Sequence, residues 1–437
     1  MIIINVKRYS IAFILSCRIE HQNEKKFYFI NIGNFIIFFY VISYISLIKY
    51  YSSQNVSLNN LFVLFSFFLF LYGLVNPLTQ IILFNIDQVY YNSIILYGIT
   101  IPSLFLGFAF KNNEFKNQLS TPFKSFSVNL QFTFCCLLVI LLIYQSYFLY
   151  EQGLLLNFQA ISEKGRGGIF TDISQLYVVS GFLITSVFLF FIYNYKKLNP
   201  LIFLILILLF YYILISIAVG NRRQIIGILL GIFWKYTELK KIKFTFLKLL
   251  SFLIFVTIFL VWGFIRDFKG DMSLSNFVDN GLTVNEFSVP YYTLIETLKN
   301  DSHTFLYGST YFINTFLLFI PRFFYSIFSI DKPDTLAINF VNDNFGGGQG
   351  YAFMPVTEAY LNFGFIGPIL IFMIIGFLFS LVEYKNNLIF RFLLITMSID
   401  FCRTEISTFI YQLFFTGLIF FFFKKINSNN NNNICIN

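Results

Sequence analysis

Residues 61–84 read LFVLFSFFLFLYGLVNPLTQIILF, an apolar run that contains no charged side chain. A helix needs about 20 apolar residues to cross a bilayer, so this run is long enough to span a membrane. Further runs of the same character predict crossing helices at 27–48, 93–110, 130–150, 173–195, 201–219, 222–236, 249–264, 358–382, 388–402 and 406–423. Because a spanning segment must satisfy its own backbone hydrogen bonds, all of these runs are expected to be helices.

The composition of the whole chain supports the same conclusion. Of its 437 residues, 57% are hydrophobic and only 12% are charged, whereas about a quarter of the residues of a soluble domain are charged. A soluble globular protein is therefore excluded. We expect an all-α, polytopic integral membrane protein with about 11–12 transmembrane helices. These form a single transmembrane domain over 1–425, and a disordered, Asn-rich tail follows at 426–437.

The positions of Lys and Arg predict the orientation of the spans. Five groups alternate along the chain, at 111–124, 196–197, 235–248, 385–391 and 424–425, and are expected to face the cytoplasm. The net charge of +9 then reflects topology, and nucleic-acid binding is not expected. The stretch 266–356 becomes one large extracytoplasmic loop region. Its own apolar run, 311–320, is too short to cross and predicts an interfacial or re-entrant helix.

Cations also occur on the predicted outer side, where the topology should deplete them, and an anionic ligand would explain them. They are Lys164, Arg166, Arg222, Arg223, Arg266, Lys269, Lys299, Arg322, Lys332 and Arg403. Arg222 and Arg223 follow Gly220 and Asn221, where a helix is expected to re-enter the membrane. A helix N-terminus with two guanidinium groups suits phosphate. The alternative is that both arginines reach lipid headgroups.

The stretch 354–364, MPVTEAYLNFG, predicts a helix that starts at Pro355. Glu358 and Asn362 are four residues apart and share one face of it. Glu358 could act as a general base if burial raises its pKa, or it could simply interact with the helix dipole. His303 is a second candidate base, although a lone exposed histidine usually has no catalytic role.

Arg403 could pair with Asp400 within one helix or join the outer cations.

Other site chemistries find no support in the sequence. No metal-binding spacing of His, Cys, Asp or Glu is present, so no metal is expected. The Gly-rich segment 346–350 lacks the Lys-Ser/Thr of a phosphate-binding loop, so neither a nucleotide nor any other cofactor is expected.

Several of these features occur in an order that resembles a known family. Between residues 130 and 425, the chain resembles the Wzy-type oligosaccharide repeat-unit polymerases of O-antigen and capsule synthesis. The landmarks are NEF at 285–287, YG at 307–308, PR at 321–322, KP at 332–333, the Gly-rich segment and EAYLNFG at 358–364. The resemblance implies a GT-C-like, metal-independent glycosyltransferase of the bacterial cytoplasmic (inner) membrane, with its active site facing outside.

The resemblance also implies substrates and partners, and together with the outer cations it predicts roles for individual residues. Donor and acceptor would be undecaprenyl-diphosphate-linked oligosaccharides; membrane lipid and a chain-length regulator are the other candidate partners. Glu358 or His303 would remove the proton of the acceptor hydroxyl. Diphosphate or glycan would be bound by Arg166, Arg222, Arg223, Arg322, Lys332, Tyr360, Asn362 and Arg403. An O-antigen ligase is an alternative. So is a lipid-linked oligosaccharide flippase or other transporter, although internal repeats and mid-membrane charges are not visible.

Overall fold

The fold is all-helical in the part of the chain that the structure, a computed structural model, describes. That part comprises residues 24–53, 61–82, 87–110, 128–153, 155, 175–194, 200–219, 225–232, 287–299, 305–320, 353–384, 388–418 and 421. Stretches long and apolar enough to cross a bilayer lie in α2 (Leu61–Ile82), α3 (Gln88–Ala109), α4 (Val128–Glu151) and α16 (Ile366–Tyr384). The predicted polytopic, all-α membrane fold is confirmed.

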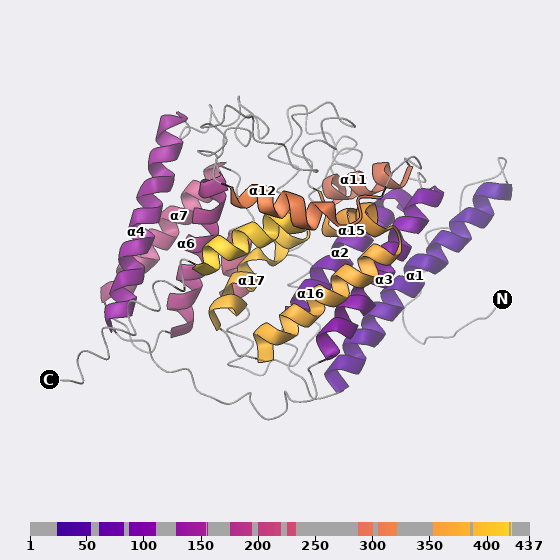
Figure 1. The fold of residues 1–437 in the computed structure, drawn as a ribbon, viewed down its shortest axis with the longest axis horizontal. Coiled ribbons are helices and arrows are strands. Elements are labelled where there is room, and N and C mark those ends of the chain that lie inside the picture. Colours follow the sequence, from indigo (N-terminus) through magenta and orange to yellow (C-terminus); the bar gives the residue numbers. More distant parts are fainter. Residues whose placement is uncertain are drawn as a thin grey trace.

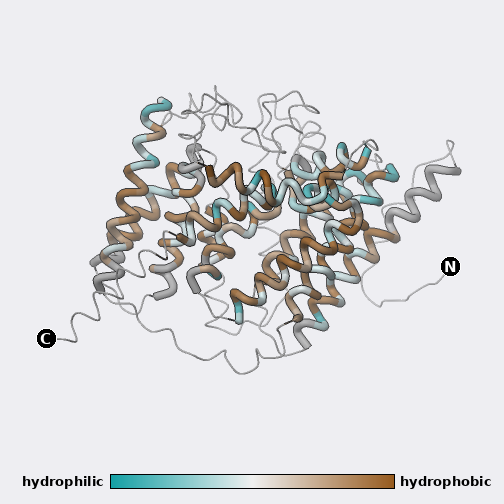
Figure 2. The backbone as a smooth tube through the Cα atoms, viewed as in Figure 1, coloured by the Kyte–Doolittle hydropathy of each residue, from teal (hydrophilic) through white to brown (hydrophobic). Residues whose placement is uncertain are grey.

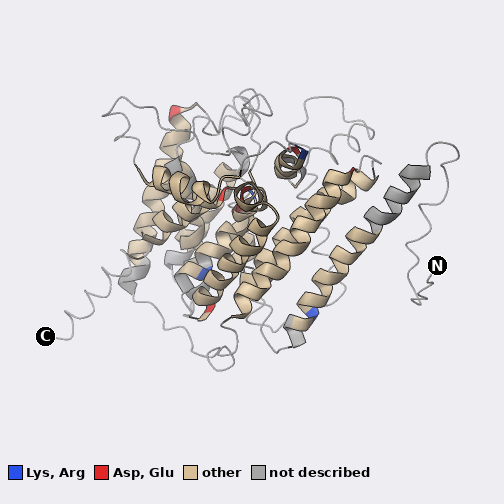
Figure 3. Cartoon of the chain, turned by 45° about the vertical axis from the view of Figure 1, so that its right-hand side comes forward, with Lys and Arg blue, Asp and Glu red and all other residues tan. Residues whose placement is uncertain are grey.

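The long helices form two groups that are joined by α17 (Leu388–Phe401). One group contains α1 (Glu24–Ser53), α2, α3 and α16, and the other contains α4, α6 (Gln175–Asn194) and α7 (Pro200–Val219) (Figure 1). Helix α17 packs against both α2 and α6. The helix shafts are predominantly apolar (Figure 2), and the coloured charged residues gather near helix ends (Figure 3). This distribution is the one that a lipid environment requires.

Glycine lets α3 and α16 approach each other backbone to backbone. A Cβ atom at Gly107 would overlap the carbonyl oxygen of Met373, and one at Gly376 would overlap that of Leu104. In lipid there is little hydrophobic force between helices, so close packing over small residues is what holds such a pair together. Because α15 (Pro355–Phe363) precedes α16 directly, this contact also fixes the position of α15.

The structure divides the span expected at 358–382 into two helices. Helix α15 ends at Phe363, and α16 begins at Ile366. Between them Gly364 has a φ of 62°, which favours glycine, and its N–H donates to the Tyr360 carbonyl at 2.7 Å. A residue with a Cβ rarely adopts this backbone conformation, so glycine allows the chain to leave the helix here. Glu358 therefore lies on a short separate helix, outside the spanning segment.

The short helices gather at one end of the bundle. They are α11 (Ser288–Lys299), the π-helix η2 (Thr310–Asn314), α12 (Thr315–Phe319) and α15 (Figure 1). At the end of α16 away from α15, Glu383 accepts a hydrogen bond from Leu61 N at 2.9 Å and pairs with Arg391 at 3.5 Å. This ion pair lies at the end of the bundle away from the short helices.

Some of the predicted segments lie wholly or partly outside the described residues. The predicted span 249–264 and the predicted disordered tail 426–437 lie outside the described residues. Of the predicted loop region 266–356, the structure describes 287–299, 305–320 and 353–356. The short apolar run predicted at 311–320 is helical, as η2 and α12, and its place at the membrane surface stays a prediction.

Candidate functional site

Glu358 is a completely buried carboxylate at the start of α15. Pro355 occupies the first turn of that helix, where its missing N–H costs no hydrogen bond. Glu358 Oε2 accepts a hydrogen bond of 2.7 Å from Ile406 N, at the beginning of the helix Ile406–Leu418. Glu358 Oε1 is buried and has no hydrogen-bond partner in the part of the chain that the structure describes. One oxygen therefore caps a neighbouring helix, and the other is a buried acceptor without a hydrogen bond in that part of the chain.

Asn362 is the centre of a buried hydrogen-bond network one turn further along α15. Its Oδ1 accepts from Gly308 N at 2.8 Å, and its Nδ2 donates to Thr310 Oγ1 at 2.7 Å and to the Glu358 carbonyl at 2.8 Å. The Asn362 carbonyl also accepts from Tyr307 N at 3.1 Å. These bonds attach residues 305–310 to the face of α15 that carries Glu358.

The attached segment has unusual backbone geometry. Tyr307 has a φ of 47°, which a residue with a Cβ rarely adopts. The chain then forms a π-helix over Thr310–Asn314, which begins after Gly308 and Ser309. Strained residues and π-helical turns both concentrate at functional sites. The YG pair at 307–308 and the motif at 358–364 are distant in sequence and adjacent here.

A second acidic residue lies next to the site, in the turn that follows α17. Glu405 is buried, as is Arg403 in the same turn, and Glu405 directly precedes the Ile406 N–H that Glu358 binds. Burial, and then the negative charge of Glu405, raise the pKa of Glu358 to about 8, against the lowering effect of the Ile406 N–H and the Thr310 hydroxyl. A carboxyl group with such a pKa can both release and take up a proton near neutral pH.

The structure describes four of the predicted site residues. Glu358 and Asn362 share one face of α15, as predicted, and Arg403 lies in the turn that leads to Ile406, which Glu358 binds. Tyr360, two residues from Glu358, points elsewhere and packs edge-on against Phe365, with 5.4 Å between ring centroids. The other predicted residues lie outside the described part: His303, Arg166, Arg222, Arg223, Arg322 and Lys332. Their roles stay predictions.

The sequence did not indicate three residues that the structure brings to Glu358. They are Thr310, Tyr311 and Glu405. The charge of Glu358 contributes, after burial, to a raised pKa of the Tyr311 hydroxyl, and Tyr311 stacks on Phe363 at 6.4 Å. Tyr311, Asn314 and Thr315 follow an i, i+3, i+4 pattern within an apolar run, which was a signal that this stretch has one polar face.

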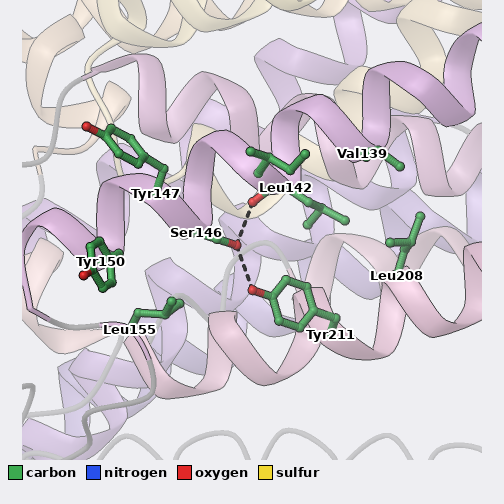
Figure 4. Close-up of a pocket in the computed structure, with 9 residues that line it drawn as sticks. Val139, Leu142, Ser146, Tyr147, Tyr150, Leu155, Leu208 and Tyr211 are labelled. Carbon is green, nitrogen blue, oxygen red and sulfur yellow. Dashed lines mark hydrogen bonds between the residues drawn. The ribbon is translucent and has the colours of Figure 1, made fainter.

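A hollow of about 400 Å³ lies between α4 and α7 and does not include Glu358 (Figure 4). Its lining is formed by Val139, Leu142, Ile143, Ser146, Tyr147, Tyr150, Leu155, Leu208 and Tyr211. The hydroxyls of Ser146 and Tyr211 are 2.8 Å apart and hydrogen-bond each other. This lining contains no charged side chain, so the hollow is unsuited to proton transfer or diphosphate binding.

No cluster of three or more His, Cys, Asp or Glu side chains that could hold a metal ion occurs within the described ranges. Comparison with curated proteins and with solved structures gives no match. A comparison with family models does give one: the model of the O-antigen polysaccharide polymerase Wzy matches residues 10–430, nearly the whole chain. With the apolar helical bundle and the site built from the YG and EAYLNFG motifs, this match shows that the chain belongs to the Wzy family of O-antigen polysaccharide polymerases.

Proposed function

We propose that this Wzy-family protein joins undecaprenyl-diphosphate-linked oligosaccharide repeat units at the outer face of the cytoplasmic membrane. The observation that carries the proposal is the buried carboxylate of Glu358, with one oxygen unpaired among the described residues and a pKa near neutrality. A polymerase needs such a group, because the acceptor hydroxyl must lose a proton as it attacks. The family match favours polymerisation over the ligase and transporter alternatives.

In the proposed reaction, the acceptor hydroxyl oxygen attacks the anomeric carbon of the donor sugar. The new glycosidic C–O bond forms while the bond from that carbon to the diphosphate oxygen breaks, and the electron pair leaves with undecaprenyl diphosphate. Glu358 takes the acceptor proton. Arg222 or Arg223, with Arg322 and Arg166, would bind the diphosphate and stabilise the charge that accumulates on it. Arg403 is buried in the turn that precedes Ile406, whose N–H Glu358 accepts.

Reconstituted polymerisation without divalent cations tests this function. We expect the purified protein in liposomes to convert lipid-linked repeat units into a polymer ladder in excess EDTA, because arginines supply the positive charge that metal ions supply elsewhere. Liposomes without protein are the control. Absence of polymer from lipid-linked units would contradict the proposed function. A ladder lost in EDTA and restored by magnesium or manganese would show that the arginines are insufficient.

The pH dependence tests the role of Glu358 as a base. A base works only when ionised, so kcat/KM is expected to rise with pH up to about 8, by about tenfold per unit well below that value, and then level off. Removing the neighbouring negative charge with Glu405→Gln should lower the pKa of Glu358 and move the profile to lower pH. Initial rates between about pH 6 and about pH 9.5 measure both effects. A rate that falls with pH over this range would instead mean that Glu358 works in its protonated form.

A further inference from the structure

The helical segment Thr310–Phe319 has its polar and apolar faces reversed relative to a surface helix of a soluble protein. Three of its large apolar side chains point outward, whereas Leu318 is buried: Phe312 is 78% exposed, Ile313 56% and Phe316 68%. Its polar atoms are buried: Tyr311 Oη, Asn314 Nδ2 and Thr315 Oγ1. The buried atoms of residues 311, 314 and 315 therefore lie on the side of the segment away from the exposed rings. We call them the inner face of the segment.

No hydrogen bond of ordinary length and angle reaches any of the three inner-face atoms within the ranges that the structure describes, and the Asn362 side chain lies near enough to Tyr311 to oppose the rise in the pKa of its hydroxyl. Buried polar atoms are normally paired, and each exception needs a reason. Glu358 Oε1 is a fourth such atom, and the Glu358 side chain is completely buried. Four buried polar groups of this kind in one region indicate a binding surface whose hydrogen bonds are completed by a ligand.

The inner face extends away from Glu358 along one neighbouring helix. At the Tyr311 end, the segment is attached to α15 by the bond between Thr310 and Asn362. At the other end, Phe319 packs on Phe414 of the helix Ile406–Leu418, with 4.9 Å between ring centroids. That helix begins where Glu358 binds Ile406 N. Figure 1 shows α12 lying along this yellow helix, and along the chain Asn314 and Thr315 lie between Tyr311 and Phe319.

The chemistry of the inner face limits what it can bind. A phenol, an amide and a hydroxyl offer donors and acceptors but no charge. A diphosphate would need cations, whereas an apolar lipid chain would leave all three groups unpaired. A sugar ring, which carries several hydroxyl groups close together, matches them.

We propose that Tyr311, Asn314 and Thr315 bind the acceptor sugar, and that the reacting hydroxyl lies between Tyr311 Oη and Glu358 Oε1. This inference rests on the proposed function. Tyr311 would donate to or accept from the hydroxyl and hold it in line with the carboxylate that takes its proton. The outward Phe312, Ile313 and Phe316 would face lipid, so that the segment separates the sugar from the bilayer.

Two substitutions that remove only a hydroxyl test the proposal, Tyr311→Phe and Thr315→Val. The concentrations of the two substrates can be varied independently if the donor is a repeat unit that lacks its acceptor hydroxyl and the acceptor is a repeat unit on a short lipid. Each variant should raise the KM for the acceptor by about threefold to tenfold, the effect of one lost neutral hydrogen bond, and leave the KM for the donor unchanged. Tyr150→Phe on α4 is the matched control, because this tyrosine is 72% exposed and should behave as wild type.

Thermal stability in detergent distinguishes binding from a structural role. Removing a buried polar group that has no partner should leave stability unchanged or raise it, so both variants should unfold at or above the wild-type temperature. Loss of stability with an unchanged acceptor KM would overturn the proposal, because the hydroxyls would then serve the fold. A raised donor KM would overturn it too, as would wild-type kinetics in both variants. Wild-type protein that makes no polymer would instead refute the proposed function and, with it, this inference.

Discussion

Glu358→Gln is expected to abolish polymer formation almost completely while the amount of protein in the membrane stays normal. The glutamine amide oxygen can still accept the Ile406 N–H that Oε2 accepts at 2.7 Å, so the helix Ile406–Leu418 keeps its cap. An amide cannot take up a proton, and loss of a general base typically slows a reaction by about a hundredfold to ten-thousandfold. Ladder length in a strain without its own polymerase, with membrane abundance measured in parallel, checks the result.

The same substitution elsewhere provides the control for Glu358. Glu296 on α11 forms an exposed pair with Lys299 at 2.8 Å, and such pairs contribute little to stability. Glu296→Gln should therefore give wild-type ladders. If Glu358→Gln also gave wild-type ladders, Glu358 would serve only as a cap and the base would have to be sought elsewhere, with His303 as the next candidate.

Asn362→Leu is expected to detach residues 305–310 from α15 and to remove activity together with stability. Leucine has a similar size but leaves the buried Gly308 N–H without its acceptor and Thr310 without its donor. Breaking a buried network of this kind costs about 2–4 kcal/mol. Thermal denaturation in detergent is followed by the fraction of protein that stays monodisperse, and a lower midpoint would show the lost stability. The ladder assay would show the lost activity.

Asn76→Leu is a matched control, because we expect it not to lower the stability of the protein. Asn76 is completely buried in α2, and neither its Oδ1 nor its Nδ2 has a hydrogen-bond partner in the described part of the chain. Asn76→Leu should therefore leave stability unchanged or increase it. If Asn362→Leu and Asn76→Leu had equal midpoints, the hydrogen bonds of Asn362 would not hold the site together.

Much of the local structure could be read from the sequence. The run 61–84 became α2 (Leu61–Ile82), and Pro355 starts α15 as predicted. These features depend on residues close together in the chain: apolar length sets a spanning helix, and proline sets the first helical turn. The shared face of Glu358 and Asn362 follows from helix geometry for the same reason.

The division at Gly364 was not predicted, because apolar composition continues from α15 into α16. Hydropathy reports how well a residue suits lipid, and a glycine within such a run is compatible with a continuous helix. The positive φ of Gly364 and the close contact of Gly367 with the Ala359 carbonyl arise from packing around the site. Hydropathy does not report such contacts, and they place Glu358 on a separate short helix.

The sequence by itself determined that this protein is a helical membrane protein and that one motif carries a carboxylate and an amide on one helix face. Only the tertiary structure decided that this face meets Tyr307–Thr310, Tyr311 and the turn at Glu405. The physical reason is that spanning helices in lipid are apolar on all sides. Hydropathy therefore determines where helices form, whereas close packing over glycine and buried hydrogen bonds determine which faces meet.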